Sequence, residues 1–355
     1  MERTRPGAQV LTVAVAGKEA RAVNYVALLG EVAPEEQVLL NTTAVRAGLG
    51  TGGYHFIMKR AGEERPATQG HIVKLRYTPL QFRCRTVEEE GSPYREALEA
   101  TADLGSTSVI VAPLHSHVPA AAAAVKALAP EARVVYVMTD TAALPLAFSE
   151  LVPQLKEAGM VEASITVGQA FGGDHEAVNL YTGLLAARGV LGADVVIVAQ
   201  GPGNVGTETE WGFGSIAQGE QINAVTVLGG VPIAVPRISF ADARPRHQGV
   251  SRQSLIALGR VALTQAVVSV PDMAPEKLSL VQRQLEEEGI FDKHEVLVAR
   301  GEPGVELLRA RGIEVKTMGR TMAEDPEFFL AAGAAGAIAA ARFRTPEAGG
   351  EAEDE

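Results

Sequence analysis

The chain contains 355 residues, of which 46% are hydrophobic, 21% charged and 5% aromatic. This composition is typical of a globular protein and excludes collagen-like, coiled-coil and wholly disordered classes. The formal net charge of −11 argues against general binding of DNA or RNA, which requires a basic surface. The single cysteine, Cys84, excludes an internal disulfide framework and a multi-cysteine zinc site.

The distribution of apolar residues predicts a cytoplasmic protein without a membrane partner. Residues 1–7 are charged and do not resemble a signal peptide. The longest weakly polar run, at 331–341, consists mainly of small residues and is too short to span a bilayer.

The first part of the chain, residues 1–90, is predicted to form a small all-β domain. Short stretches rich in Val, Leu, Tyr, Phe and Thr are separated there by glycine and proline turn signals. We expect a small β-barrel, because closure of a sheet removes its exposed edges. The predicted strands are 9–15, 20–26, 37–43, 54–60, 71–77 and 82–87.

Residues 91–345 show a different pattern, in which continuous apolar runs alternate with amphipathic or alanine-rich segments. Such runs are typical of parallel strands covered on both faces, and their alternation with helices predicts right-handed crossovers. We predict an α/β domain with a mostly parallel, doubly wound, Rossmann-like sheet, and a (β/α)8 barrel is the alternative. The acidic tail at 346–355 is predicted to be disordered. The predicted strands are 108–112, 133–138, 163–167, 194–199, 232–235, 266–270, 295–299 and 314–317, and the predicted helices are 118–128, 147–158, 175–189, 215–228, 251–264, 275–288, 303–311 and 326–342.

Two histidines, His115 and His117, follow the first strand of this α/β domain. Ligands of α/β proteins bind at the carboxyl ends of the strands, so we predict that these imidazoles are catalytic groups or ligands of a divalent metal. Asp140 and Asp174 follow the next two strands and are predicted to orient a histidine or to complete the metal shell. A purely structural role of the histidines, as a helix cap and as packing beneath a loop, is the competing interpretation.

Gly172 and Gly173 come directly before Asp174, after the third predicted strand. We expect the glycines to form a tight turn and Asp174 to cap the helix that follows. The same glycines are candidate ligand-binding residues, because free amides at such a turn point toward a bound group.

The segment 201–206, which contains Gly201 and Gly203, matches the pattern G-x-G-x-x-G. It follows the fourth strand of the domain instead of the first, and no acidic residue ends the next strand to hold a ribose. We therefore favour a loop that binds a phosphate or a small polar ligand over a dinucleotide site. A plain irregular loop is the competing interpretation.

A basic group follows the fifth strand and contains Arg237, Arg244 and Arg246, with Asp242 and His247 beside them. Arginine recognises carboxylates and phosphates in bidentate geometry, so these residues are candidates for binding an anion. An internal network of ion pairs is the alternative interpretation.

Three longer motifs resemble an uncharacterised bacterial family, a domain of unknown function. They are VGQAFGGD at 167–174, VAQGPG at 198–203 and PRISFADARPRH at 236–247. The resemblance covers nearly the whole chain and implies a bacterial protein, but it implies no reaction, cofactor or catalytic residue.

Two functional hypotheses follow from the clustering of ionisable residues after the strands. The first is an enzyme, a hydrolase or transferase that acts on a small phosphate- or carboxylate-bearing molecule, with a divalent metal as a possible cofactor. The second is a non-catalytic protein that binds a metabolite and regulates another process. A homo-oligomer is expected in both cases, because closed dimers are common.

Overall fold

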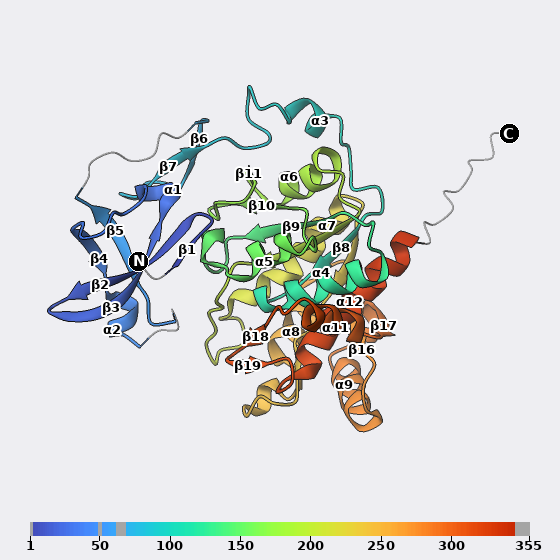
Figure 1. Ribbon diagram of the computed structural model, residues 1–355. Helices are drawn as coiled ribbons and strands as arrows, with labels where there is room; N and C mark the ends of the chain where they lie inside the picture. Colours follow the sequence, from blue (N-terminus) through green and yellow to red (C-terminus); the bar gives the residue numbers. More distant parts are fainter. Residues whose placement is uncertain (1–2, 49–51, 62–68, 345–355) are drawn as a thin grey trace.

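The structure, a computed structural model, describes residues 3–48, 52–61 and 69–344. It has a small N-terminal β part and a larger α/β part, and both are visible in Figure 1. The tail at 346–355, predicted to be disordered, lies outside the described residues.

The N-terminal part is a mixed five-stranded sheet with the strand order β1-β2-β3-β5-β4. Strand β3 pairs with β5 in parallel, and the other neighbours are antiparallel. The pairings found among the described residues run from β1 to β4 and do not join these two edges, so they show a sheet, and closure into the small β-barrel we expected is not shown. The strands are β1 (Arg3–Arg5), β2 (Ala8–Val15), β3 (Lys18–Tyr25), β4 (Val38–Asn41) and β5 (His55–Arg60), and two short helices, α1 (Val26–Leu29) and α2 (Thr43–Arg46), accompany them.

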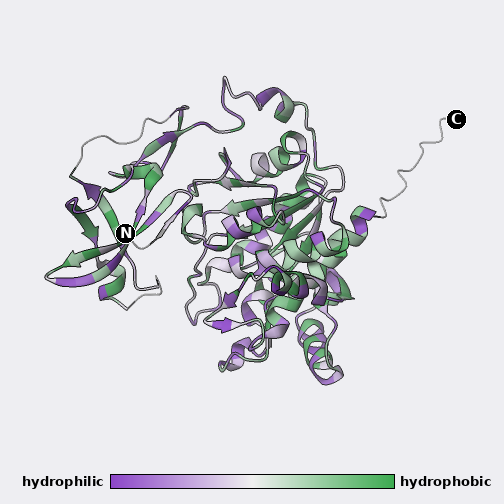
Figure 2. Cartoon of the chain, in the orientation of Figure 1, coloured by the Kyte–Doolittle hydropathy of each residue, from purple (hydrophilic) through white to green (hydrophobic). Residues whose placement is uncertain are grey.

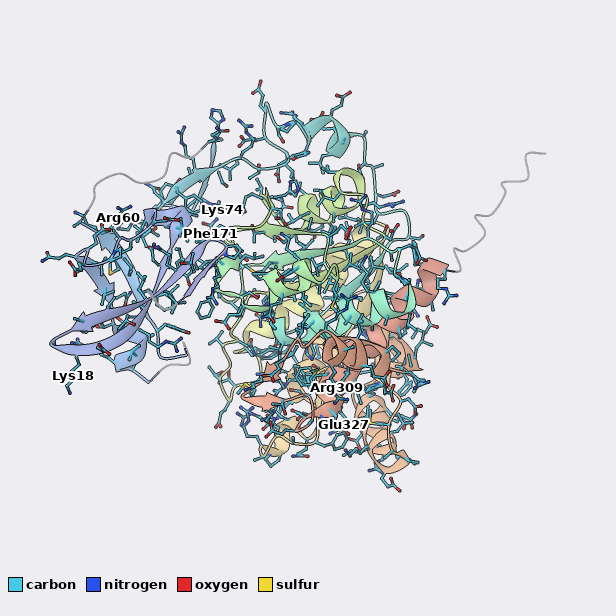
Figure 3. The ribbon with its side chains drawn as sticks, viewed as in Figure 1. Lys18, Arg60, Lys74, Phe171, Arg309 and Glu327 are labelled. Carbon is cyan, nitrogen blue, oxygen red and sulfur yellow. The ribbon has the colours of Figure 1, made fainter. Side chains whose placement is uncertain are left out.

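A hairpin of β6 (Ile72–Lys74) and β7 (Phe82–Cys84) joins the two parts and precedes α3 (Arg95–Glu99). Lys74 is completely buried, and its ammonium lies 2.5 Å from the Glu176 carboxylate and 2.5 Å from the Ala170 carbonyl. The ring of Phe82 packs edge-on against Phe171. Lys74 and Phe171 lie together where the hairpin meets the α/β part (Figure 3).

The α/β part contains an eight-stranded parallel sheet with the order β11-β10-β9-β12-β8-β13-β16-β17. The order is not sequential and the edges are different strands, so the sheet is open and the alternative of a (β/α)8 barrel is wrong. The central strands are buried along their whole length and are coloured as hydrophobic in Figure 2, as the apolar runs predicted. The strands are β8 (Ser108–Val111), β9 (Val134–Thr139), β10 (Ala163–Val167), β11 (His175–Ala177), β12 (Val195–Gln200), β13 (Val231–Ala234), β16 (Val267–Pro271) and β17 (Glu295–Ala299).

Helices cover both faces of this sheet, which confirms the predicted α/β class. Helices α4 (Val118–Leu128), α11 (Glu302–Ala310) and α12 (Pro326–Arg344) pack together, and α12 covers the sheet from β8 to β17. Helices α6 (Leu180–Leu185) and α7 (Ala217–Val227) pack together on the sheet as well. The remaining helices are α5 (Leu151–Glu157), α8 (Arg252–Ile256), α9 (Pro275–Glu287) and α10 (Ile290–Lys293). None of the helices in the described part of the chain is long and apolar enough to cross a bilayer.

Two predicted elements near the sheet differ in the structure. The helix expected at 175–189 begins only at Leu180. Residues 175–177 form edge strand β11, and α6 then continues into a π-helical segment at 186–190. Asn179 caps α6 by accepting a hydrogen bond from the Thr182 N–H. The last predicted strand, at 314–317, does not join the sheet. It forms β18 (Lys316–Thr317), which pairs with β19 (Arg320–Thr321) in a small hairpin. A second short pair consists of β14 (Ile238–Ser239) and β15 (Gly249–Val250).

Glycines allow α12 and α11 to approach α4 closely. A Cβ atom at Gly336 in α12 would overlap the carbonyl oxygen of Ala121 and lie 2.7 Å from the Cβ of Ala124. A Cβ at Gly304 in α11 would overlap the carbonyl oxygen of Ala120. The run of alanines in α4 is completely buried, so neither helix can move away without opening the core.

We expect Gly336→Ala to destabilise the protein. In an open helix the same change stabilises by about 1 kcal/mol, but here the added methyl group overpacks a backbone contact, at a cost of about 1–3 kcal/mol. Thermal unfolding measures the effect, with Glu306→Ala on the exposed face of α11 as the control. An unchanged or raised Tm in Gly336→Ala would show that the helices separate freely.

Candidate functional site

A cavity of about 320 Å³ lies at the carboxyl ends of the central strands. We call it the strand-end pocket, and its lining residues come from four segments: 114–116 after β8, 148–151 before and within α5, 202–204 after β12, and 316–318 in and after β18. Its volume falls at the lower end of the range for small-molecule sites.

The sheet topology explains the position of this pocket. Strands β8 and β12 are parallel neighbours. The chain passes from β8 into α4, which packs with α12, and from β12 into α7, which packs with α6. The two loops therefore separate toward opposite faces of the sheet and leave a crevice between them, which is the usual ligand position in open α/β sheets.

His115 lies on the wall of the strand-end pocket and is hydrogen-bonded through both ring nitrogens. Its Nδ1 is 3.1 Å from the Tyr136 hydroxyl, and its Nε2 is 2.7 Å from Ser149 Oγ. The Tyr136 hydroxyl donates to the Gln200 carbonyl at 3.1 Å, so it accepts from Nδ1–H and leaves Nε2 to accept the Ser149 proton. Burial lowers the pKa of His115 to about 4, so the ring is neutral at pH 7.

Ser149 was not among the predicted site residues, because the predicted helix at 147–158 placed it inside a helix. The helix in fact begins at Leu151, and Ser149 Oγ accepts hydrogen bonds from the N–H groups of Leu151 and Val152, each at 3.2 Å. A serine just before an apolar helical segment is a helix-start signal, so the sequence contained a clue to this position.

The segment that carries Ser149 is held by the N-terminal sheet. The Arg5 guanidinium of β1 lies 2.7 Å from the Glu150 carboxylate and 3.3 Å from the Phe148 carbonyl. The rings of Phe56 and Phe148 are 6.2 Å apart between centroids. One wall of the strand-end pocket is thus held in place by residues of the N-terminal sheet.

Gln200, at the end of β12, joins the loops around the pocket. Its amide nitrogen donates to the Pro113 carbonyl and to Asn204 Oδ1, each at 3.1 Å, and its oxygen accepts from Thr141 Oγ1 at 3.0 Å. Of the two predicted glycines here, Gly203 has a φ of +89° and lines the pocket. A Cβ at Gly201 would overlap the Ala143 carbonyl oxygen, so this glycine allows the loops after β12 and β9 to touch.

His117 lies away from the pocket lining, beneath α12. It is completely buried, its ring stacks on Phe328 with centroids 4.0 Å apart, and neither of its nitrogens has a hydrogen-bond partner. Burial and the nearby Arg237 charge lower its pKa to about 3. His115 and His117 therefore do not converge, and within the described ranges no three or more His, Cys, Asp or Glu side chains are grouped to hold a metal ion.

The two predicted aspartates make local contacts and do not bind His115. Asp140 Oδ2 accepts the Gln169 N–H at 2.8 Å. We had expected Asp174 to cap a helix, but it does not. It pairs with Lys156 at 2.5 Å and accepts the Ser164 N–H at 2.7 Å, which holds the start of β11 against β10.

Gly172 and Gly173 lie in the turn between β10 and β11. Gly172 has a φ of +89°, and its N–H donates to Glu176 at 2.7 Å. A Cβ at Gly173 would come within 2.9 Å of the Thr166 nitrogen. Gly172 and Asp174 line a separate cavity of about 520 Å³, which N-terminal residues such as Tyr25 also line.

The predicted basic group forms an ion-pair network around Asp242, which is 2% exposed. Its carboxylate lies 2.8 Å from Arg237 and 2.7 Å from Arg244, and Arg320 of β19 is 3.6 Å away. The Arg244 hydrogen bond, helped by the Arg237 charge, holds the Asp242 pKa well below its usual range. We call Arg237, Asp242, Arg244 and Arg320 the Asp242 cluster.

The other predicted members of this group lie at its edge. His247 Nδ1 accepts from Arg237 at 3.0 Å and is 2.7 Å from Ser251 Oγ. Burial and the Arg237 charge lower the His247 pKa to about 4. Arg246 points to the surface and pairs with the exposed Glu208 at 3.2 Å.

The fold and the pocket define a two-part α/β protein with a small-molecule-sized crevice at its strand ends. The chain belongs to the family described as "Protein of unknown function (DUF3866)", whose family model matches residues 21–336. This match confirms the resemblance to an uncharacterised family that the three motifs indicated. The chain matches none of the curated proteins with which it was compared.

We expect Asp242→Asn to destabilise the protein by about 3 kcal/mol or more, because it leaves buried Arg237 beside other guanidinium groups without a full counter-charge. Chemical denaturation measures the loss. Glu208→Gln, which weakens an exposed pair with Arg246, is the control and should change stability by less than about 1 kcal/mol. Equal effects of the two changes would contradict a stabilising role for the cluster.

We also expect stability to fall between pH 7 and pH 5. His115, His117 and His247 have pKa values of about 4, about 3 and about 4 in the folded protein against 6.5 ordinarily, so the unfolded chain binds more protons in this interval. The three histidines together account for roughly 5 kcal/mol of the loss. His117→Leu should lose about a third of this pH dependence in urea titrations at the two pH values, and an unchanged dependence would refute the assignment.

Proposed function

We propose that the strand-end pocket binds a small molecule with a phosphate or carboxylate group, and that the protein acts on it as a hydrolase or transferase. The observation that carries the proposal is the hydrogen-bonded series Ser149–His115–Tyr136, of which Ser149 and His115 line the pocket and Tyr136 lies behind them. A neutral histidine that accepts a proton from a hydroxyl group is the arrangement that proton transfer requires.

The charges around the pocket favour an anionic ligand. Lys316 lines the pocket, is exposed, and is in no salt bridge within the described part of the chain, although its charge helps to lower the pKa of Glu324, which hydrogen-bonds to Thr321. Glu150, the acidic residue of the lining, is neutralised by Arg5 at 2.7 Å. An ammonium group therefore remains to attract a phosphate or carboxylate.

The positive charges of the Asp242 cluster also favour an anionic ligand. Three guanidinium groups there face two carboxylates, those of Asp242 and Asp325. The cluster connects with the pocket through the β18–β19 hairpin, which presents Lys316 on one strand and Arg320 on the other. We propose that Arg237, Arg244 and Arg320 contribute a positive field and do not touch the ligand directly.

Purified protein should gain thermal stability when a matching metabolite binds. A ligand at 100 times its Kd adds about 2.7 kcal/mol, which raises Tm by several degrees. We expect such shifts from some members of a panel of phosphorylated sugars, acyl phosphates and dicarboxylates, and smaller shifts in Lys316→Gln. Lys18→Gln, on the exposed N-terminal sheet, is the matched control and should respond like the wild type.

The outcomes separate the two functional classes. A Tm shift that depends on Lys316, together with turnover of the same compound, supports the enzyme. A shift without turnover supports the non-catalytic, metabolite-binding alternative. No shift across the panel, or equal shifts in the two lysine variants, would refute the proposed anion site. The cytoplasmic location and the homo-oligomer stay predictions.

A further inference from the structure

We propose that Ser149 is the nucleophile of an acyl-transfer reaction and that His115 is its general base. The substrate class is a small carboxylic ester that carries a separate phosphate or carboxylate group. This inference rests on the proposed function, because it assigns the chemistry of the same pocket, and its test uses a probe that needs no anionic group.

The geometry meets the requirements of a serine nucleophile. Ser149 Oγ is 2.7 Å from His115 Nε2, and both residues line the pocket. The Tyr136 hydroxyl fixes the ring from the opposite side, at 3.1 Å from Nδ1, and is itself fixed by the Gln200 carbonyl. The hydroxyl proton of Ser149 therefore points at a neutral acceptor, which is the starting state of nucleophilic catalysis.

A cap of α5 does not by itself explain this arrangement. Capping requires an oxygen that accepts from backbone N–H groups, which Ser149 provides to Leu151 and Val152. It does not require a buried histidine from the segment after β8, and a completely buried tyrosine from within β9, to be aligned behind the hydroxyl group. Three separate segments of the chain thus form one hydrogen-bonded series beside a cavity.

The reaction balances with water as the second substrate. As Ser149 Oγ bonds to the acyl carbon, its proton passes to His115 Nε2, and the bond from that carbon to the alcohol oxygen then breaks while Nε2–H protonates the leaving alcohol. Water next gives a proton to Nε2 and bonds to the acyl carbon. The Oγ–carbon bond breaks, and the proton returns to Oγ. The products are an acid and an alcohol, without oxidation or reduction.

Tyr136 acts through His115 and is a positioning residue. Its hydroxyl holds the imidazole with Nε2 toward Ser149 and does not line the pocket. We therefore expect Tyr136→Phe to lower the rate of the chemical step while the affinity of the pocket for a reagent stays the same. A merely structural role would weaken both.

An uncharged alkyl fluorophosphonate tests the proposal. It phosphonylates an activated serine with loss of fluoride and the hydroxyl proton, and peptide mass spectrometry locates the adduct. We expect one adduct, on Ser149, in the wild-type protein, and none at that position in Ser149→Ala. His115→Gln should lower the labelling rate roughly 100-fold or more, and Tyr136→Phe should lower the limiting rate alone.

Ser279→Ala is the matched control, because this serine is exposed on α9, outside the pocket lining, and should not affect labelling. Mapping the adduct on the wild-type protein needs no variant, so the test stands even if Ser149→Ala fails to fold. No adduct on Ser149, or labelling at an equal rate in folded His115→Gln, would overturn the proposal. A ligand-dependent Tm shift without labelling refutes the nucleophile alone, and labelling without any shift refutes the anion site alone.

Discussion

The burial of both faces of the parallel sheet is the constraint on which the rest of the structure depends. Strands β8, β9 and β12 are completely enclosed, so their side chains are almost entirely apolar. Polar groups can enter this region only where the strands end, and each must find a partner there. The Gln200 side chain forms hydrogen bonds with three neighbouring loops at once. The Tyr136 hydroxyl joins His115 to the end of β12 by hydrogen bonds. The same requirement that stabilises the core thus concentrates hydrogen-bonding groups around the strand-end pocket.

The α/β class could be predicted from the sequence because continuous apolar runs report burial on both faces of a strand. The failures have equally physical causes. The segment that forms β11 carries charged residues and reads as a helix, and it becomes a strand because Asp174 and Glu176 bind groups on β10. The apolar alternation of the N-terminal strands does not tell whether a sheet closes. His115 could be identified from its position after β8. Ser149 could be identified only as the start of a helix, because its contact with His115 joins residues more than thirty positions apart in the chain.

The Asp242 cluster shows how an arginine-rich motif can be largely satisfied from within the protein. Sequence alone left two interpretations open, and Arg237 and Arg244 are in fact held by a carboxylate only a few residues away. The contribution of Arg320 could not be foreseen, because it comes from a hairpin that the sequence pattern assigned to the sheet. Three guanidinium groups there pair with the carboxylates of Asp242 and Asp325, and the charge of Arg320 also acts on Glu324. The cluster is therefore first of all a structural network.

The bond between Arg5 and Glu150 connects the N-terminal sheet to a wall of the strand-end pocket. Residues 148–151 form a wall of the pocket and also the surface on which strand β1 rests. A bound molecule that shifts this segment must change the free energy with which the N-terminal sheet docks. By reciprocity, a change in the N-terminal sheet that shifts residues 148–151 would change the affinity of the pocket by the same factor. The energetics of the small β part and of the strand ends therefore meet in one four-residue segment.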